Sequence, residues 1–384
     1  MERLKIISVF GTRPEAIKMA PFIKELEKYD AINSVVCVTA QHRQMLDQVL
    51  DIFNIRPHYD LGIMKDRQTL SLITTKSLNS LYSLFNEEKP HIVIVQGDTT
   101  TTFTASLAAF YLKIKIGHIE AGLRTHEKYY PYPEEINRRL TGVLGDYHFA
   151  PTKLNKNNLK KENINNENIF VTGNTVIDAL KTTIKKDYIF SEQKLNMVDF
   201  KNKKVIVVTA HRRENLGKPL EEICLSLKKI AQVNNEVQII YPVHLNPAVL
   251  EVVERILGGI SNVLLTKPLN VYDMHNLINK SYMLLTDSGG LQEEAPSLGK
   301  PVLVLRNETE RPEAVSAGTV RIAGVKQDTI IPMAQMLLNN QKEYDKMAKA
   351  VNPYGDGRAS ERIAKIILYK FGILKDKPEE FYPT

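Results

Sequence analysis

The chain has few cysteines and no long apolar run, and these absences disfavour several classes of protein. Its 384 residues include two cysteines, Cys37 and Cys224, which lie far apart in the sequence. This spacing disfavours a disulfide or a zinc site and favours buried thiols in a reducing compartment. No apolar run approaches the roughly 18 residues that a membrane span needs, and the first predicted strand, which begins at Leu4, leaves no room for a signal peptide. We therefore expect a cytoplasmic protein that does not bind a membrane.

The positive charge of the chain also lacks a pattern. Lysine and arginine number 51 against 44 acidic residues, which gives a net charge of +7. The lysines are spread thinly, and many stand beside asparagine, as in residues 153–168. No basic stripe is interleaved with aromatic residues, which disfavours nucleic acid as a partner. The charge is compatible with a small polyanionic ligand.

The sequence does contain a regular alternation of short apolar runs and amphipathic segments. Hydrophobic residues make up 43% of the chain and charged residues 25%. The predicted strands cover residues 4–10, 34–39, 92–96, 114–119, 147–150, 169–172, 205–209, 237–241, 263–265, 283–286, 302–305 and 320–322. The predicted helices include residues 15–29, 70–88, 101–112, 221–233, 291–298 and 356–374. Apolar strands of this kind, buried on both faces, are typical of parallel α/β sheets with helices on each side.

The alternation lapses over residues 181–203, where polar residues dominate, and such a segment suits a junction between domains. The length fits two domains of ordinary size. We predict an N-terminal domain over residues 1–175, joined by a C-terminal helix within 358–384, and a C-terminal domain over residues 176–357. Ligands of open α/β sheets bind beyond the carboxyl ends of the strands. Two facing domains should therefore make a cleft, and the polar residues that follow each strand are the candidate site residues.

The loop after the first strand is informative because of the glycines it lacks. A dinucleotide-binding protein would carry G-x-G-x-x-G here, but this loop holds only Gly11. Arg13 and Lys18 stand in the loop and the first helical turns instead. A helix N-terminus attracts anions through its free N–H groups and its dipole. The loop therefore predicts a phosphate-bearing ligand other than NAD, held by side chains.

Four carboxylates follow strands or open a helix in the first half of the chain. Asp98 comes after the strand 92–96, where a role as a helix cap only is as good an interpretation as a functional one. Glu120 ends the strand 114–119, and a functional role is favoured there over an ion pair with Arg124. Glu134 and Glu135 begin a helix after Pro133, so the helix dipole alone accounts well for Glu135, and Glu134 by itself does not outweigh that interpretation.

The second half of the chain places cations and glycines at the same kind of position. His211 and Arg212 follow the strand 205–209 and form, with the next arginine, a dense anion-binding set. His244 follows the next strand and is only suggestive by itself. After the strand 283–286 come Ser288, Gly289 and Gly290, whose N–H groups could cradle a phosphate, although a plain capped helix is the alternative. Two further candidates are Glu294, for ribose hydroxyls, and Arg311, as another cation.

Taken together, these segments resemble the non-hydrolysing UDP-N-acetylglucosamine 2-epimerase family. The resemblance runs in consistent order and spacing from Phe10 to about Gly357. It is carried by the motifs VFGTRPEAIKMAP, TAQHRQMLDQVL, QGDTTTTF, HIEAGLRT, PEEINRR, TAHRREN, YPVHLNP and DSGGLQEEAPSLGKPVLVLR.

The resemblance implies a GT-B fold, in which two Rossmann-like domains with parallel sheets face a deep interdomain cleft, usually in a homodimer. It implies the reversible interconversion of UDP-GlcNAc and UDP-ManNAc, which supplies ManNAc for cell-surface polysaccharide. In that family UDP is eliminated to give 2-acetamidoglucal and is then added back with the C2 proton on the other face. Neither a metal nor another cofactor is needed.

The resemblance also assigns roles to residues. The implied catalytic residues are Asp98, Glu120, Glu134 and His211. The resemblance leaves open which of the three carboxylates is the base and which is the acid. The implied UDP- and substrate-binding residues are Arg13, Lys18, His211, Ser288, Gly289, Gly290, Glu294 and Arg311. In bacterial members UDP-GlcNAc also binds as an activator in a second pocket. Its residues here would be Gln41, Gln44, Arg67, Arg212 and His244, although a plain helix start would otherwise explain the two glutamines.

Three alternatives remain beside this prediction. A hydrolysing relative would release ManNAc and UDP, but it usually carries a kinase domain that this chain lacks. A GT-B glycosyltransferase would share the DSGG segment yet would have less use for three carboxylates. A nucleotide-sugar sensor would keep the anion-binding residues, and the presence of all three carboxylates argues against it.

Overall fold

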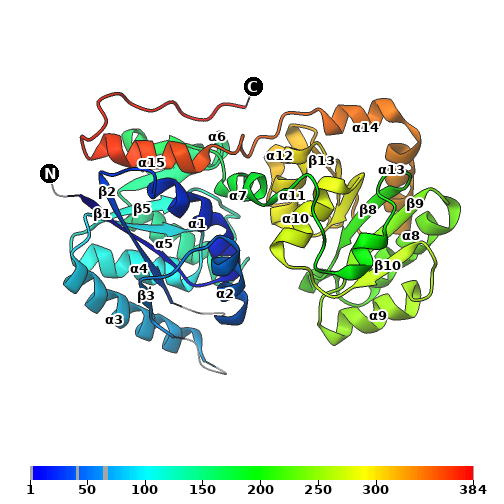
Figure 1. The fold of residues 1–384 in the computed structure, drawn as a ribbon, viewed down its shortest axis with the longest axis horizontal. Helices are drawn as coiled ribbons and strands as arrows, with labels where there is room; N and C mark the ends of the chain where they lie inside the picture. Colours follow the sequence, from blue (N-terminus) through cyan, green and yellow to red (C-terminus); the bar gives the residue numbers. More distant parts are fainter. Residues whose placement is uncertain (1–2, 40–42, 64–67, 384) are drawn as a thin grey trace. The chain divides into compact units, whose positions relative to one another are not determined.

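The computed structural model describes residues 3–39, 43–63 and 68–383 (Figure 1). The chain forms two compact units, which we describe separately. The first unit comprises Met1–Ala179 and Tyr354–Tyr382, and the second comprises Leu180–Pro353 and Pro383–Thr384. The C-terminal helix therefore belongs to the first unit, whereas the second unit is built from one continuous stretch of chain apart from two terminal residues.

The first unit is a parallel sheet in the order β3-β2-β1-β4-β5-β6-β7. Its strands are β1 (Leu4–Phe10), β2 (Ile32–Val38), β3 (Tyr59–Asp60), β4 (Ile92–Gln96), β5 (Lys115–Ile119), β6 (Tyr147–Ala150) and β7 (Ile169–Val171). Its helices are α1 (Arg13–Leu26), α2 (Arg43–Ile52), α3 (Leu70–Glu88), α4 (Thr100–Tyr111), α5 (Glu134–Leu144), α6 (Lys153–Lys161), α7 (Thr175–Thr183, which runs into the second unit), α15 (Ala359–Lys370) and the 3-10 turn η1 (Asn166–Asn168).

The second unit is a parallel sheet in the order β10-β9-β8-β11-β12-β13. Its strands are β8 (Lys204–Thr209), β9 (Val237–Pro242), β10 (Val263–Thr266), β11 (Met283–Thr286), β12 (Val302–Val304) and β13 (Val320–Ile322). Its helices are α8 (Lys218–Val233), α9 (Pro247–Leu257), α10 (Val271–Lys280), α11 (Gly289–Glu294), α12 (Pro312–Ser316), α13 (Gln327–Asn339), α14 (Gln341–Ala348) and the 3-10 turns η2 (Gln193–Met197), η3 (Arg213–Asn215) and η4 (Ala295–Leu298).

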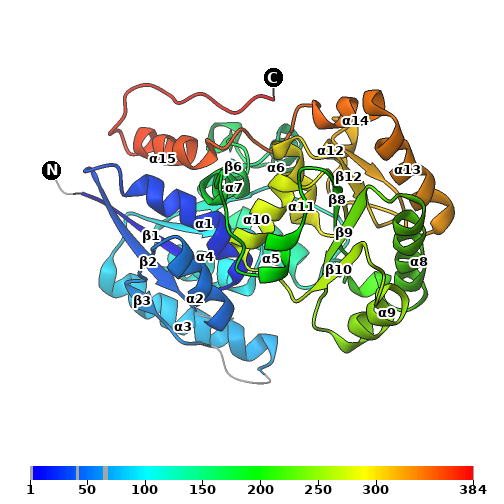
Figure 2. The same ribbon diagram turned by 45° about the vertical axis from the view of Figure 1, so that its right-hand side comes forward.

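The sheets form because their central strands are apolar on both faces. β1 is buried along almost its whole length, with Ile6 and Ile7 fully enclosed on opposite faces. β8 is likewise buried at every residue after its first. Helices cover both faces, since alternate strand residues would otherwise meet water. In Figure 2, α8 and α13 lie side by side over one face of the second sheet, and the two helices are in contact.

Each sheet reverses its strand order at its centre. β1 pairs with β2 on one side and with β4 on the other, and β8 pairs in the same way with β9 and β11. The chain leaves the two neighbouring strands in opposite directions at such a switch point, which opens a crevice at their carboxyl ends. The loops after β1 and β4, and those after β8 and β11, are therefore adjacent.

The C-terminal segment completes the first unit. α15 packs alongside α1 (Figure 1), and the Asp178 carboxylate accepts hydrogen bonds from the first backbone N–H groups of α15, at Ala359 and Ser360. Further on, the backbone N–H of Phe381 donates to the carbonyl of Val171 at 2.7 Å. The tail thus covers the edge strand β7, whose backbone would otherwise be open to another chain.

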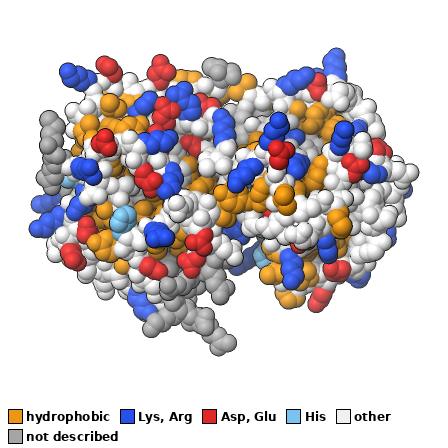
Figure 3. Space-filling model, in the orientation of Figure 1, with side chains coloured by type: hydrophobic (Ala, Val, Ile, Leu, Met, Phe, Trp, Pro, Cys, Tyr) orange, Lys and Arg blue, Asp and Glu red, His pale blue; other side chains and the backbone are white. Residues whose placement is uncertain are grey.

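The predicted fold class, α/β with two parallel-sheet units, is confirmed. The predicted strands are present, several with identical bounds, as for β1, β4 and β11. The two-residue strand β3 was not predicted, because so short a segment has no periodicity. Within the described residues, no helix has both the length and the apolar character to cross a membrane. On the face drawn in Figure 3, basic and acidic side chains are intermingled over both units.

Candidate functional site

Three carboxylates meet at the carboxyl edge of the first sheet, and we call Asp98, Glu120 and Glu134 the carboxylate cluster. Asp98 lies in the turn after β4, and Glu120 directly follows the neighbouring strand β5. Glu134 is the first residue of α5, which packs against α4. The negative charges of Glu120 and Glu134 both act on Asp98. The structure therefore brings together the three carboxylates among the four residues that the resemblance assigned to catalysis, whereas His211 belongs to the second unit.

Glu120 is held by a strained backbone and by several donors. Its φ is +64°, a left-handed conformation that a non-glycine residue adopts at a cost of about 1–3 kcal/mol. Lys18 Nζ lies 2.6 and 2.7 Å from its two carboxylate oxygens, and Asn174 donates at 3.1 Å. The amide of Gln96 donates as well. The carboxylate is thus fixed in direction before any ligand binds.

Lys18 was expected to help hold UDP. In this structure its ammonium contacts Glu120, and its role toward a phosphate stays a prediction. Arg13, the other predicted cation of this loop, opens α1 and is half-buried.

Asp98 pairs with an arginine that the sequence analysis missed. Arg138 Nη2 lies 2.6 Å from Asp98 Oδ2, and the Asn137 amide donates to the Asp98 carbonyl at 3.0 Å. Burial raises the pKa of Asp98, while the Arg138 guanidinium opposes that shift. The cap of α4 is Thr99, whose hydroxyl accepts from the Thr102 N–H. The interpretation of Asp98 as a helix cap only is therefore wrong.

Glu135 does more than favour the dipole of α5. It is fully buried, and its carboxylate accepts from the backbone N–H groups of Thr125 at 3.1 Å and His126 at 3.2 Å. Arg138 Nη1 lies 3.4 Å from the same carboxylate. Arg138 thus joins Glu135 to Asp98, and the spacing Glu135–Arg138, one helical turn, was the signal in the sequence.

Arg124 turns away from Glu120. Its guanidinium makes two bonds to the Glu162 carboxylate, at 2.9 and 2.8 Å, and its side chain is fully buried. The alternative of a Glu120–Arg124 ion pair is therefore wrong.

A buried carboxylate joins the loops after β1 and β4. Glu15 accepts from the backbone N–H groups of Gly11 at 3.0 Å and Thr12 at 2.8 Å, and from the Thr99 hydroxyl at 2.6 Å. Burial raises the pKa of Glu15, while these donors oppose the shift. The pair Thr12–Glu15 is a capping box, and its T-x-x-E spacing is visible in the sequence. Glu15 thereby fixes the loop of Arg13 against the turn of Asp98.

Positive charge gathers at the carboxyl edge of the second sheet, and we call His211, Arg212 and Arg311 the cationic cluster. A buried carboxylate that the sequence analysis did not select, Asp287, organises it from the end of β11. Asp287 accepts from the backbone N–H groups of His211 at 2.7 Å and Arg212 at 2.8 Å, and from the Asn215 amide at 3.0 Å. Asp287 therefore fixes the HRRE loop across the switch point.

His211 and His244 are stacked. Their ring centroids lie 5.0 Å apart at an interplanar angle of 6°. Burial lowers the pKa of His211, Asp287 at 3.8 Å opposes that shift, and His244 and Arg212 add to it. The structure thus joins a residue predicted for the active site to one predicted for a second pocket.

Gly289 and its neighbours lie beneath two guanidinium groups. A Cβ added at Gly289 would be 3.7 Å from terminal nitrogens of both Arg212 and Arg311. The Ser288 side chain makes no capping hydrogen bond to α11, so a simple serine cap does not explain this segment. Arg311 is paired with Glu293, and Arg212 lies 3.4 Å from Glu310. The guanidinium groups are therefore oriented by carboxylates around a glycine backbone.

Glu294, predicted to bind ribose, is nearly buried one turn beyond this backbone. Its Oε2 lies 3.4 Å from His275 Nε2, and a Cβ at Gly290 would be 3.2 Å from its Oε1. Of the residues predicted for a second pocket, Arg212 lies beside Gly289 and His244 is stacked on His211, as described above. Gln41, Arg67 and the Gln44 side chain lie outside the described residues.

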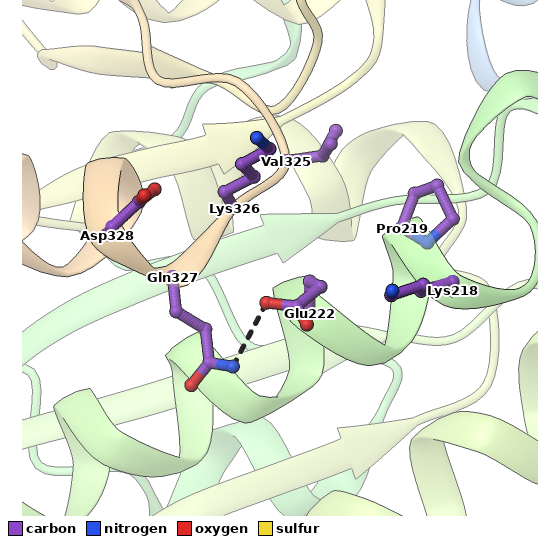
Figure 4. Close-up of a pocket in the computed structure, with 7 residues that line it drawn as sticks. All are labelled: Lys218, Pro219, Glu222, Val325, Lys326, Gln327 and Asp328. Carbon is purple, nitrogen blue, oxygen red and sulfur yellow. Dashed lines mark hydrogen bonds between the residues drawn. The ribbon is translucent and has the colours of Figure 1, made fainter.

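A separate pocket of about 560 Å³ lies between the starts of α8 and α13, and none of the candidate residues lines it (Figure 4). Lys218 and Lys326 face it together with Glu222 and Asp328, so its formal charges balance. Gln327 donates to Glu222 at 3.0 Å within it. Its lining does not resemble either cluster.

Comparison with known proteins gives a consistent result. A family model described as UDP-N-acetylglucosamine 2-epimerase matches residues 24–368. The UDP-N-acetylglucosamine 2-epimerase of Bacillus subtilis (strain 168) is 56% identical over 381 residues, 99% of each chain. A structure of S. aureus MnaA with UDP is 48% identical over all of both chains, with a TM-score of 0.91. The UDP-GlcNAc 2-epimerase of Neisseria meningitidis bound to UDP-GlcNAc is 52% identical, covers 95% of this chain and 99% of that one, and has a TM-score of 0.88.

The chain is an α/β protein of the GT-B type, as are its structural neighbours. One of its two parallel-sheet units carries the carboxylate cluster and the other the cationic cluster. The chain belongs to the UDP-N-acetylglucosamine 2-epimerase family.

Proposed function

We propose that the protein is a non-hydrolysing UDP-GlcNAc 2-epimerase of the cytoplasm. It would interconvert UDP-GlcNAc and UDP-ManNAc and so supply ManNAc for cell-surface polysaccharide. The observation that carries the proposal is the carboxylate cluster, in which Lys18 holds Glu120, Arg138 holds Asp98, and the charge of Glu134 acts on Asp98. The S. aureus and N. meningitidis relatives, crystallised with UDP and UDP-GlcNAc, support the choice of substrate.

The reaction inverts C2 of the sugar, whose proton is weakly acidic. A carboxylate removes this proton while UDP departs from C1, which leaves 2-acetamidoglucal. UDP then adds back to C1, and an acid returns a proton to C2 from the opposite face. Two members of the carboxylate cluster share these steps, since general base and general acid must approach opposite faces of the ring. Neither metal nor nicotinamide takes part in this scheme.

The cationic cluster stabilises the departing diphosphate. Charge develops on the pyrophosphate as the C1–O bond breaks, and preorganised cations and N–H groups lower the barrier most when they already point at that charge. Arg311 and the Gly289–Gly290 backbone would provide such groups, and His211 is proposed to act with them. Arg13, Lys18, Ser288 and Glu294 complete the proposed substrate contacts.

We also propose that UDP-GlcNAc activates the enzyme from a second pocket formed by Gln41, Gln44, Arg67, Arg212 and His244. The support from the structure is the stacking of His244 on His211 and the position of Arg212 beside Gly289. A ligand on His244 would therefore contact a ring that is itself in contact with the proposed active site.

The protein is proposed to act as a homodimer. The packed helices α3, α4 and α5 carry large apolar side chains that are at least 42% exposed, namely Tyr82, Phe110, Tyr111, Leu140 and Val143. A second copy would remove this surface from water. Sedimentation of the wild type and of Phe110→Glu/Val143→Glu tests this, with a dimer expected for the first and a monomer for the second.

Incubation of the pure protein with UDP-GlcNAc in D2O, without added NAD or metal, tests the reaction. UDP-ManNAc with deuterium at C2 is the expected product. Free ManNAc as the main product would show a hydrolysing enzyme. Absence of deuterium at C2 would exclude both epimerases and leave a transferase or a sensor.

A further inference from the structure

Two histidines lie side by side in the core of the first sheet, outside the residues assigned to the reaction. His118 on β5 and His148 on β6 are partners in register, and each is at most 1% exposed. In each ring Nε2 lies against a glycine carbonyl oxygen. The distance is 2.7 Å to Gly97 for His118 and 3.1 Å to Gly145 for His148. The two histidines are therefore matched in residue type, depth and bonding.

The protonation of both rings follows from their burial. Burial lowers the pKa of His118 to about 3 and that of His148 to about 4, so both rings are neutral near pH 7. A neutral imidazole carries one N–H, and a carbonyl oxygen can only accept. Nε2 is therefore the protonated atom in both. Within the described residues, Nδ1 of each ring has no hydrogen-bond partner.

The two glycines lie at opposite edges of the sheet and precede different residues. Gly97 has a φ of +72° and precedes Asp98, whereas Gly145 ends α5 and precedes Asp146, at the amino edge of the sheet. The N–H of Gly97 donates to the carbonyl of Ile119 on β5 at 3.0 Å. With His118, both polar groups of Gly97 are bound to β5.

The bond from His118 controls a peptide that could otherwise rotate. The Gly97 carbonyl belongs to the same peptide plane as the N–H of Asp98, so the orientation of this peptide sets the direction of the Asp98 side chain. Glycine opposes such a rotation least of all residues because it has no Cβ. If the Gly97 carbonyl lost its donor while buried, the unsatisfied oxygen would cost about 1–3 kcal/mol. This cost would favour another orientation of the Gly97–Asp98 peptide.

We propose that His118 is a positioning residue, whose hydrogen bond to the Gly97 carbonyl holds the Asp98 carboxylate in its reactive direction; this rests on the proposed role of Asp98. His148 makes the same kind of bond to a glycine that no candidate residue follows, and it supports the fold alone.

The matched variants His118→Phe and His148→Phe test the proposal. Each keeps a ring of similar size and removes the N–H donor, so both should lower the melting temperature. His118→Phe should lower kcat about 10- to 100-fold, because a displacement near 1 Å of a reacting group has about this effect. KM for UDP-GlcNAc should stay within about threefold, since binding groups elsewhere are untouched. His148→Phe should leave kcat unchanged.

Two further variants separate positioning from general damage. His118→Gln supplies an amide N–H and should recover part of the lost kcat. In an Asp98→Asn background, His118→Phe should lower the residual C2 deuterium exchange by much less than tenfold, because its effect acts through Asp98.

The outcomes are distinct. A wild-type protein without epimerase activity would refute the proposed function. An active wild type with equal loss of kcat in the two phenylalanine variants, or with full additivity in the Asp98→Asn background, would overturn the positioning role alone. Failure of every His118 variant to fold would also overturn it, since the residue would then be structural.

Discussion

The two clusters carry opposite charges and are supported in opposite ways. In the first unit the carboxylates are the proposed reacting groups, and cations such as Lys18 and Arg138 orient them. In the second unit the cations are the proposed binding groups, and carboxylates such as Asp287 and Glu293 orient them. Each unit thus uses one sign of charge for support and presents the other. In the proposed reaction, the first unit would move the proton and the second would hold the diphosphate.

The largest expected effect is the loss of turnover on changing the carboxylate cluster. Asp98→Asn or Glu120→Gln should lower kcat by about 10²–10⁴-fold, the range for removal of a general acid or base. UDP binding, measured by calorimetry, should survive because the second unit is intact. Glu127→Gln, the same kind of change on an exposed neighbouring loop, serves as the control. Equal turnover in Asp98→Asn and wild type would remove Asp98 from the catalytic set.

Acid should weaken the first sheet around its two buried histidines. The pKa of His118 is about 3 and that of His148 about 4 in the folded chain, against 6.5 for a free side chain. Both values are depressed, so their contribution to stability is full above pH 6.5 and is lost as the pH falls toward 4, because only the unfolded chain takes up the protons. At pH 5 the loss is ~2 kcal/mol for each histidine.

Amide hydrogen exchange from pH 7.5 to pH 5, corrected for the intrinsic rate, follows this loss in each unit. The strands β5 and β6 should lose protection while β8 and β11 retain it. Earlier loss in the second sheet would contradict the contrast between the units.

Removal of an oriented cation should weaken UDP binding more than turnover. The double variant Arg311→Gln/Glu293→Gln deletes the ion pair without leaving a buried charge alone. The Kd for UDP should rise about tenfold, which corresponds to one charge-assisted hydrogen bond of roughly 1.5 kcal/mol. Arg321→Gln/Glu343→Gln removes another Arg–Glu pair of the second unit, which is bonded at 2.8 Å, more exposed and formed by no candidate residue, and should leave the Kd unchanged. A collapse of kcat with unaltered Kd would show that Arg311 serves the chemical step.

The smallest effect concerns the proposed second pocket. The rate of the wild type should depend sigmoidally on UDP-GlcNAc concentration, and Gln44→Ala should flatten the curve while the maximal rate changes little. Gln48→Ala, one turn further along α2 on its exposed side, is the matched control. Identical curves for the wild type and Gln44→Ala would count against the pocket.

Much of the fold could be predicted because central strands such as β1 and β11 are continuous apolar runs with abrupt polar ends. Helix bounds were less accurate where caps decide them: α1 begins at Arg13 because the Thr12–Glu15 box sets its start. The strand β3 could not be found, since its two residues are defined only by pairing with β2.

The candidate residues could be predicted where they follow strands, as Asp98, Glu120 and His211 do. The contacts of their partners could not, although local spacing marks Glu15 by its capping box with Thr12 and Arg138 by its one-turn distance from Glu135. Arg138, Asp287 and Glu15 act through contacts that are long in sequence, such as 76 residues between His211 and Asp287. Local spacing therefore identified the charged groups and missed the contacts that orient them. His118 was hidden for the same reason, because the strand sequence gives no sign of what this buried polar side chain touches.

The composition of the first unit from two separate stretches of chain sets an order of synthesis. Residues 180–353 are synthesised before residues 354–382, so most of the second sheet is made while the first still lacks α15 and the tail over β7. Until then, the backbone of β7 and the apolar side of α1 are available to other nascent chains. The unit that is begun first during translation is therefore the one that is finished last.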